Sequence, residues 1–140
     1  MSVADDFPIK EVIPHSHEMI LIDEVIDHGA EFLTARVRIK PSSLFAEAEG
    51  VPAWVGVDYM AQTIAAWSGV NAKLEGRDVK VGYLVATRKY TAHQMHFAVG
   101  ELLTIHVQQE YFLDEMGIFQ CSITSDKLVA EAALNVYQPD

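Results

Sequence analysis

Residues 52–69 read PAWVGVDYMAQTIAAWSG and are apolar on nearly every side of a predicted helix. A helix without a broad polar face is normally buried in the core of a domain. Asp58 and Gln62 are the exceptions, and because they lie four residues apart they share one helical face. A carboxylate in such surroundings must be paired, hydrogen-bonded or shifted in pKa. Asp58 is therefore either a partner of the helix dipole or an acid or base in a pocket.

Most of the remaining chain predicts β-strands. The extended segments comprise residues 20–26, 32–39, 79–90, 102–108, 118–124 and 128–136. Turns between them are predicted at residues 27–30, 116–117 and 125–127. The pattern indicates a single α+β domain over residues 1–140, with an antiparallel sheet wrapped around one long central helix. Since such a sheet leaves the helix half covered, we expect a second subunit to complete its burial.

Charge and composition exclude several classes of function. Twenty acidic residues against ten basic ones give a formal net charge of −10, so the surface would repel nucleic acids and anionic lipids. The longest apolar stretch is interrupted by Asp58, Gln62 and Ser68, and no signal sequence is evident, so we expect a cytoplasmic protein without a membrane span. Cys121 is the single cysteine, which leaves no intrachain disulfide and no thiolate metal site.

Several short motifs occur in a fixed order along nearly the whole chain. They are Pro14-His15, Asp23-Glu24-Val25, Phe45, Asp58-Tyr59-Met60-Ala61-Gln62 and Phe97-Ala98-Val99-Gly100-Glu101. In this order they resemble the β-hydroxyacyl-acyl carrier protein dehydratases, which have the hot-dog fold. The longer string at residues 54–62, followed by Ala65-Ala66-Trp67, is similar to the divergent dehydratase-like proteins of bacterial aryl polyene pigment clusters.

The resemblance implies removal of water from a 3-hydroxyacyl thioester that is carried on the phosphopantetheine arm of an acyl carrier protein. It implies active sites at the boundary of a homodimer or heterodimer, and no metal or further cofactor. By position, Asp58 matches the family's helix acid, Gln62 the amide that follows it, and Gly56 the glycine near the helix start. Trp54 and Tyr59 are candidates to line the acyl pocket, and they are equally ordinary as core residues.

The sequence departs from the family at the catalytic histidine. The ordinary dehydratases carry it in a Gly-His-Phe-Pro-Gly loop some fourteen residues before the acid, whereas residues 43–50 here read SLFAEAEG. His15 and His17 are the candidate replacements, because both would point to the same side of an extended segment. The alternative interpretation is a loop histidine that bonds the backbone or, for His15, one that holds the N-terminal turn in place. A metal site built from His15, His17 and Asp58 is a weaker hypothesis, because no third histidine is placed beside them.

Three functional hypotheses remain open. In the first, a dehydratase uses Asp58 with His17 or His15, and the N–H of Gly56 stabilises the thioester oxygen. In the second, a thioesterase of the same fold uses the carboxylate to activate water. In the third, the chain is a non-catalytic subunit, and a complete dehydratase subunit supplies the missing histidine.

The stretch around residues 88–96 offers a possible docking place for the carrier protein. Carrier proteins are acidic, and Arg88 and Lys89 form one of the few basic pairs in this chain. The nearby His93 and His96 are expected to be solvated.

Overall fold

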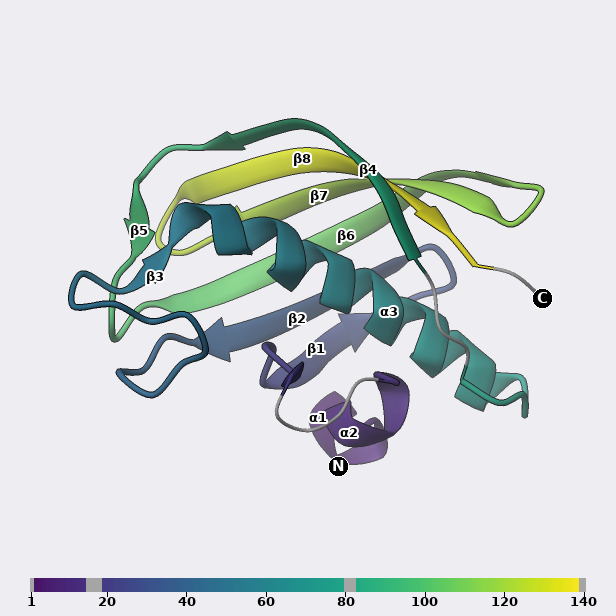
Figure 1. Ribbon diagram of the computed structural model, residues 1–140. Helices are drawn as coiled ribbons and strands as arrows, with labels where there is room; N and C mark the ends of the chain where they lie inside the picture. Colours follow the sequence, from purple (N-terminus) through teal and green to yellow (C-terminus); the bar gives the residue numbers. More distant parts are fainter. Residues whose placement is uncertain (1, 15–18, 80–82, 139–140) are drawn as a thin grey trace.

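The computed structural model describes residues 2–14, 19–79 and 83–138 (Figure 1). Within these residues six strands form one antiparallel sheet in the order β1-β2-β6-β7-β8-β4. The strands are β1 (Glu24–His28), β2 (Phe32–Arg38), β4 (Tyr83–Ala92), β6 (Leu102–Leu113), β7 (Met116–Thr124) and β8 (Leu128–Tyr137). The helix α3 (Gly56–Leu74) lies across one face of this sheet. The predicted α+β fold, a sheet around one long central helix, is confirmed.

Alternating side chains explain why the sheet covers this helix. In β2 the residues Leu33, Ala35 and Val37 are buried while their neighbours are partly exposed, as the two-residue repeat of a strand requires. The same alternation runs along β6 and β7. The apolar face formed in this way packs against the buried side chains of α3, which include Tyr59, Met60, Ile64 and Val70.

Two short N-terminal helices were not predicted from the sequence. They are α1 (Val3–Asp6), which Ser2 caps by accepting a hydrogen bond from the N–H of Asp5 at 3.2 Å, and α2 (Ile9–Val12). Val12 of α2 is fully buried and lies against Gly69 of α3. Helices of one turn have no periodic pattern to reveal them, and tertiary packing stabilises them instead.

The central helix begins later and ends later than residues 52–69. Pro52 belongs to the short strand β3 (Val51–Pro52), which pairs with β5 (His96–Phe97), and a 3₁₀ turn η2 (Ala53–Val55) leads into α3. The helix continues to Leu74 because no helix breaker occurs before Gly76, whose φ of 71° ends it. No helix in the described ranges is long and apolar enough to cross a membrane.

Two of the predicted turns were wrong in position. Met116 and Gly117 begin β7, and the hairpin turn lies at Asp114 and Glu115, with φ of 53° and 69°. A two-residue loop with both residues at positive φ matches the twist of the flanking strands, so β6 and β7 stay paired up to Leu113 and Met116, beyond a register shift at Gln109. Residues 27–28 likewise extend β1, so the first reversal falls at residues 29–31. The turn at residues 125–127 is confirmed.

Candidate active site at the start of the central helix

The start of α3 is held in place by Tyr90 from β4. The hydroxyl of Tyr90 donates a hydrogen bond to the carbonyl of Ala53, and the N–H of Gly56 donates to the same oxygen. A Cβ on Gly56 would lie only 2.1 Å from the Tyr90 hydroxyl, so glycine is needed for this close approach. The Gly56 N–H is thus already engaged within the helix turn, and an oxyanion role would require it to share that bond.

Asp58 follows in the first turn of α3 and is half-buried. Burial raises the pKa of its carboxyl group because the charged form is poorly solvated there. Within the described part of the chain, no hydrogen bond or ion pair engages this carboxylate, so it is available to a ligand or a partner subunit. A carboxyl group with a raised pKa keeps its proton at higher pH than an exposed aspartate does, which suits it to donate a proton. His15 and His17, its proposed counterparts, lie outside the described residues.

Gln62 lies one turn further along α3 and holds a neighbouring segment. Its Oε1 accepts a hydrogen bond from the N–H of Leu21 at 2.7 Å, and its Nε2 donates to the carbonyl of Met19 at 2.6 Å. The side chain is only 7 % exposed. Gln62 therefore provides hydrogen-bond partners for the carbonyl of Met19 and the N–H of Leu21, and it holds the segment that leads into β1. The structure shows this bracing role, and contact with the substrate remains a prediction.

Replacing Gln62 with leucine is expected to lower the free energy of unfolding by about 2 kcal/mol or more, because two backbone groups lose their partners while the volume is kept. Urea denaturation would measure this change. Gln120→Leu is the matched control. Gln120 is exposed on β7 and its amide donates only to the exposed Glu110 carboxylate, so its change should stay within about 0.5 kcal/mol. Equal effects of the two substitutions would show that Gln62 does not brace the segment.

The two aromatic candidates have different surroundings. Tyr59 is 2 % exposed and packs near Phe97, with ring centroids 5.9 Å apart. Burial, Asp23 and Asp58 together raise the pKa of its hydroxyl to about 12, so Tyr59 stays neutral and can donate a hydrogen bond. Trp54 is 60 % exposed, so the interpretation of Trp54 as a core residue was wrong. Its ring packs near that of Phe45, with the ring centroids 5.5 Å apart. The exposed Trp54 and Phe45 rings lie beside the start of α3, where a partner subunit or substrate could cover them.

By its spacing, Leu44 matches the place where the dehydratases that this chain resembles carry their loop histidine. It lies fourteen residues before Asp58 and directly before Phe45, the order that the histidine loop of the dehydratases has. Its side chain is 40 % exposed and lines a pocket of about 260 Å³ together with Tyr59. Leucine has no ionisable group and cannot move a proton. The loop therefore offers no ionisable side chain at this spacing, while α3 carries the carboxyl group of Asp58.

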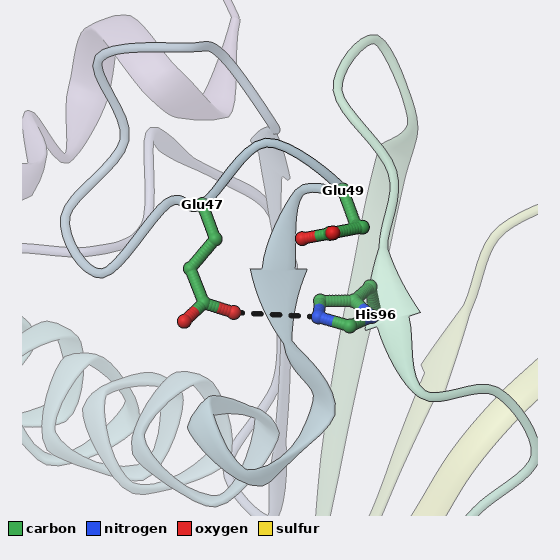
Figure 2. A group of neighbouring side chains, drawn as sticks. All are labelled: Glu47, Glu49 and His96. Atoms are coloured by element: carbon green, nitrogen blue, oxygen red, sulfur yellow. Dashed lines mark hydrogen bonds and ion pairs between the residues drawn. The ribbon is translucent and has the colours of Figure 1, made fainter.

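A histidine does approach the same loop from another strand. His96 of β5 is half-buried, and its Nε2 lies 3.4 Å from Oε1 of Glu47, with Glu49 beside them (Figure 2). The expectation that His96 would be solvated is thus wrong in part. These three residues are a group that could hold a metal ion, since their ligand atoms lie within 4.8 Å of one another. Glu47 and Glu49 are exposed, and exposed carboxylates commonly cluster without any ion.

The basic pair and its neighbouring histidine have other surroundings. Arg88 and Lys89 are in β4 rather than in a loop, and both are exposed beside an irregularity in the pairing with β8. His93 is exposed as expected and lies 3.6 Å from the carboxylate of Glu131.

Sequence reasoning missed Tyr90 and the pocket beside Leu44. Tyr90 has no motif around it, and its hydrogen bond to Ala53 joins residues 37 positions apart. The residues that line the pocket come from the segment before β1, from the end of β2 and the loop after it, and from the first turn of α3. These segments lie side by side only in the folded chain. The spacing of Leu44 from Asp58 was the one signal in the sequence that could have identified the vacant histidine position.

Comparison with known proteins places this chain among the dehydratases. Residues 7–140 match the ApeP-like family, which is described as ApeP dehydratase. The chain is 28 % identical to the 3-hydroxyacyl-[acyl-carrier-protein] dehydratase FabZ of Lactobacillus helveticus, over all of this chain and 97 % of the relative.

Similar solved structures have the same fold as this chain. One is the dehydratase heterocomplex ApeI:P from Xenorhabdus doucetiae, with a TM-score of 0.89 and 25 % identity over 95 % of this chain and 91 % of that chain. The PaaI protein of Escherichia coli, from a phenylacetic acid degradation operon, has a TM-score of 0.64 and 12 % identity over 81 % and 80 % of the two chains. At this identity the likeness to PaaI shows the hot-dog fold alone.

Proposed function

Because the chain belongs to the ApeP-like dehydratase family, we propose that it removes water from 3-hydroxyacyl groups on an acyl carrier protein as one subunit of a heterodimer. In this assembly Asp58 faces a histidine that a complete, related dehydratase subunit supplies. The proposal places the reaction in aryl polyene or fatty acid biosynthesis in the cytoplasm.

The observation that carries this proposal is that Leu44 stands at the histidine position while the helix acid, Asp58, is retained. A two-chain site takes its histidine from one subunit and its acid from the other, so a homodimer of this chain would have two acids and no loop histidine. A heterodimer would have one working site, formed by Asp58 and the partner's histidine. The similarity to a dehydratase heterocomplex supports this arrangement.

The chemistry divides between the two groups. The histidine removes the weakly acidic proton at C2, and Asp58 donates a proton to the hydroxyl that leaves C3 as water. The raised pKa of Asp58 suits the donor role, because the group keeps its proton at higher pH than an exposed aspartate does. Negative charge that develops on the thioester oxygen needs hydrogen-bond donors, which the N-terminus of α3 can present.

The experiment compares the purified chain alone with the chain plus a complete dehydratase subunit from the same organism. Each is incubated with a 3-hydroxyacyl carrier protein, and mass spectrometry follows the loss of one water. We expect a rate with both subunits that exceeds the rate of the complete subunit alone. Water loss by the chain alone would contradict the proposal and favour His15 or His17 as the base. Release of the free acid would identify a thioesterase.

Leu44→His tests the vacant position directly. If only this group is missing, the variant alone is expected to gain measurable water loss, because each site of a homodimer would then contain a histidine and Asp58. A gain of about 100-fold over the wild-type chain is the scale of one acid–base group. Leu44→Gln is the control, since it is polar but does not titrate. Equal rates for the two variants would show that Leu44 does not mark the catalytic position.

A further inference from the structure

The outermost strand of the sheet, β4, has a β-bulge near the start of α3. Its pairing with β8 advances three residues along β4, from Arg88 to Thr91, while β8 advances only two. In a regular strand Tyr90 would share the outer face with Arg88, because side chains two residues apart lie on one face. The extra residue reverses this, so that Thr91 takes the outer face and Tyr90 packs against the core. The bulge is therefore what directs Tyr90 toward α3.

Lys89 is the residue in the bulge whose backbone takes up the change of direction. Its φ of 55° lies in the left-handed region, which residues other than glycine rarely adopt. Strained backbone persists only where the surrounding structure holds it, and bulges that redirect a side chain are frequent beside functional sites. The Lys89 side chain is exposed, so its own packing does not explain the strain. The contact that the bulge secures is the one made by Tyr90.

The segment of residues 90–95 fixes both backbone groups of Ala53, the first residue of η2. The Ala53 N–H donates to the carbonyl of Met95 at 2.9 Å, and the Ala53 carbonyl accepts a hydrogen bond from the Tyr90 hydroxyl. In the part of the chain that the structure describes, no side chain caps η2 or α3 at its N-terminus. Tyr90 therefore helps to set where the first turn of α3, and Asp58 within it, lies.

The Tyr90 hydroxyl would also support the oxyanion role of Gly56. Burial raises the pKa of this hydroxyl to about 12, so it keeps its proton and remains a donor. The Ala53 carbonyl accepts both this hydroxyl and the Gly56 N–H, as the two lone pairs of a carbonyl oxygen allow. If the Gly56 N–H turns to a thioester oxygen, the Ala53 carbonyl keeps one donor and is not left unpaired.

We propose that Tyr90 is a positioning residue for the dehydration, which fixes the start of α3 and keeps the Ala53 carbonyl hydrogen-bonded while the Gly56 N–H stabilises the thioester oxygen. Tyr90 acts through the backbone of Ala53 and does not touch the reacting atoms. The inference rests on the proposed function, because it concerns how the site around Asp58 is held. Since charge develops on the thioester oxygen only in the transition state, loss of the Tyr90 hydroxyl should lower kcat and leave KM unchanged.

The kinetics of the heterodimer test this role. Tyr90→Phe is expected to lower kcat for water loss about tenfold, less than the roughly 100-fold effect of removing an oxyanion donor outright, with KM for the 3-hydroxyacyl carrier protein unchanged. Tyr111→Phe is the matched control, because it removes one hydroxyl from an exposed tyrosine of β6. The unfolding transition would verify that both variants fold. An unchanged kcat in Tyr90→Phe, or a raised KM at unchanged kcat, would overturn the proposal.

Two substitutions of Lys89 test whether the bulge directs Tyr90. Both remove the same charge, so they form a matched pair. Lys89→Gly is expected to keep kcat, since glycine adopts positive φ without strain. Lys89→Val is expected to lower kcat about tenfold, since a β-branched residue disfavours this conformation and the helix start would be misplaced. Adding Tyr90→Phe to Lys89→Val should lower kcat no further, and additive losses would show that the bulge does not act through Tyr90.

Amide hydrogen exchange separates this inference from the proposed reaction. In the purified chain, Tyr90→Phe is expected to speed exchange at residues 56–59 about tenfold, whereas Tyr111→Phe should leave it unchanged. Unchanged exchange in Tyr90→Phe would overturn the inference whatever the heterodimer catalyses. Faster exchange, together with a wild-type heterodimer that removes no water, would keep Tyr90 as the residue that fixes the start of α3 and reject the proposed reaction.

Discussion

Replacement of Asp58 with asparagine is expected to slow water loss by the heterodimer about 100-fold or more, the usual contribution of a positioned acid or base. Asparagine keeps the size and hydrogen-bonding capacity of the side chain but cannot donate an acidic proton to the leaving hydroxyl. The rate would be measured with saturating 3-hydroxyacyl carrier protein. Asp126→Asn, at the exposed turn after β7, is the control and should keep the wild-type rate. A wild-type rate in Asp58→Asn would remove Asp58 from the mechanism.

The raised pKa of Asp58 also predicts how rate and stability depend on pH. As the proton donor, Asp58 would lose activity as pH rises through its pKa, so the alkaline limb of the rate profile should disappear in the residual activity of Asp58→Asn. The folded state holds this proton at pH values where the unfolded chain has released it. The contribution of this proton to the free energy of unfolding is therefore complete below the pKa that Asp58 has in the unfolded chain. It is lost as pH rises through the pKa that Asp58 has in the folded state. The asparagine variant should lack this decline, which urea denaturation across the same pH range would measure.

Gly69→Ala is expected to lower the free energy of unfolding by about 2–3 kcal/mol, the cost of overpacking a core. A Cβ at this position would lie 1.9 Å from the carbonyl oxygen of Val12 and 2.7 Å from its carbonyl carbon. These are backbone atoms of the fully buried end of α2, so they cannot turn away as a flexible side chain would. Helix propensity alone predicts the opposite sign, a gain of about 1 kcal/mol.

Ala65→Gly measures the propensity contribution at a half-buried position of the same helix and should cost about 1 kcal/mol. Denaturation with urea would compare both variants with the wild type. A neutral or stabilising Gly69→Ala would show that α2 can separate from α3 at little cost, which would contradict the close packing of the two helices.

The elements whose signals are local could be predicted from the sequence. The apolar helix around Asp58 and Gln62, the strand pattern of β2, β6, β7 and β8, and the order of motifs that identifies a dehydratase all depend on residues close together in the chain. Periodic burial makes such signals readable, because a helix or strand repeats its buried positions at a fixed interval. The absence of histidine in residues 43–50 was evident in the same way, and with it the hypothesis of an incomplete site.

How these elements meet could not be predicted from the sequence. The buried amide of Gln62 looked like a substrate ligand in the sequence, yet it bonds backbone groups more than forty positions away. Tyr90 meets Ala53, and Gly69 meets Val12, across similarly long separations in the chain. Hydrogen bonds and close packing between distant segments leave no periodic trace in a single sequence. They exist only once the sheet has wrapped the helix, and they set the geometry around Asp58.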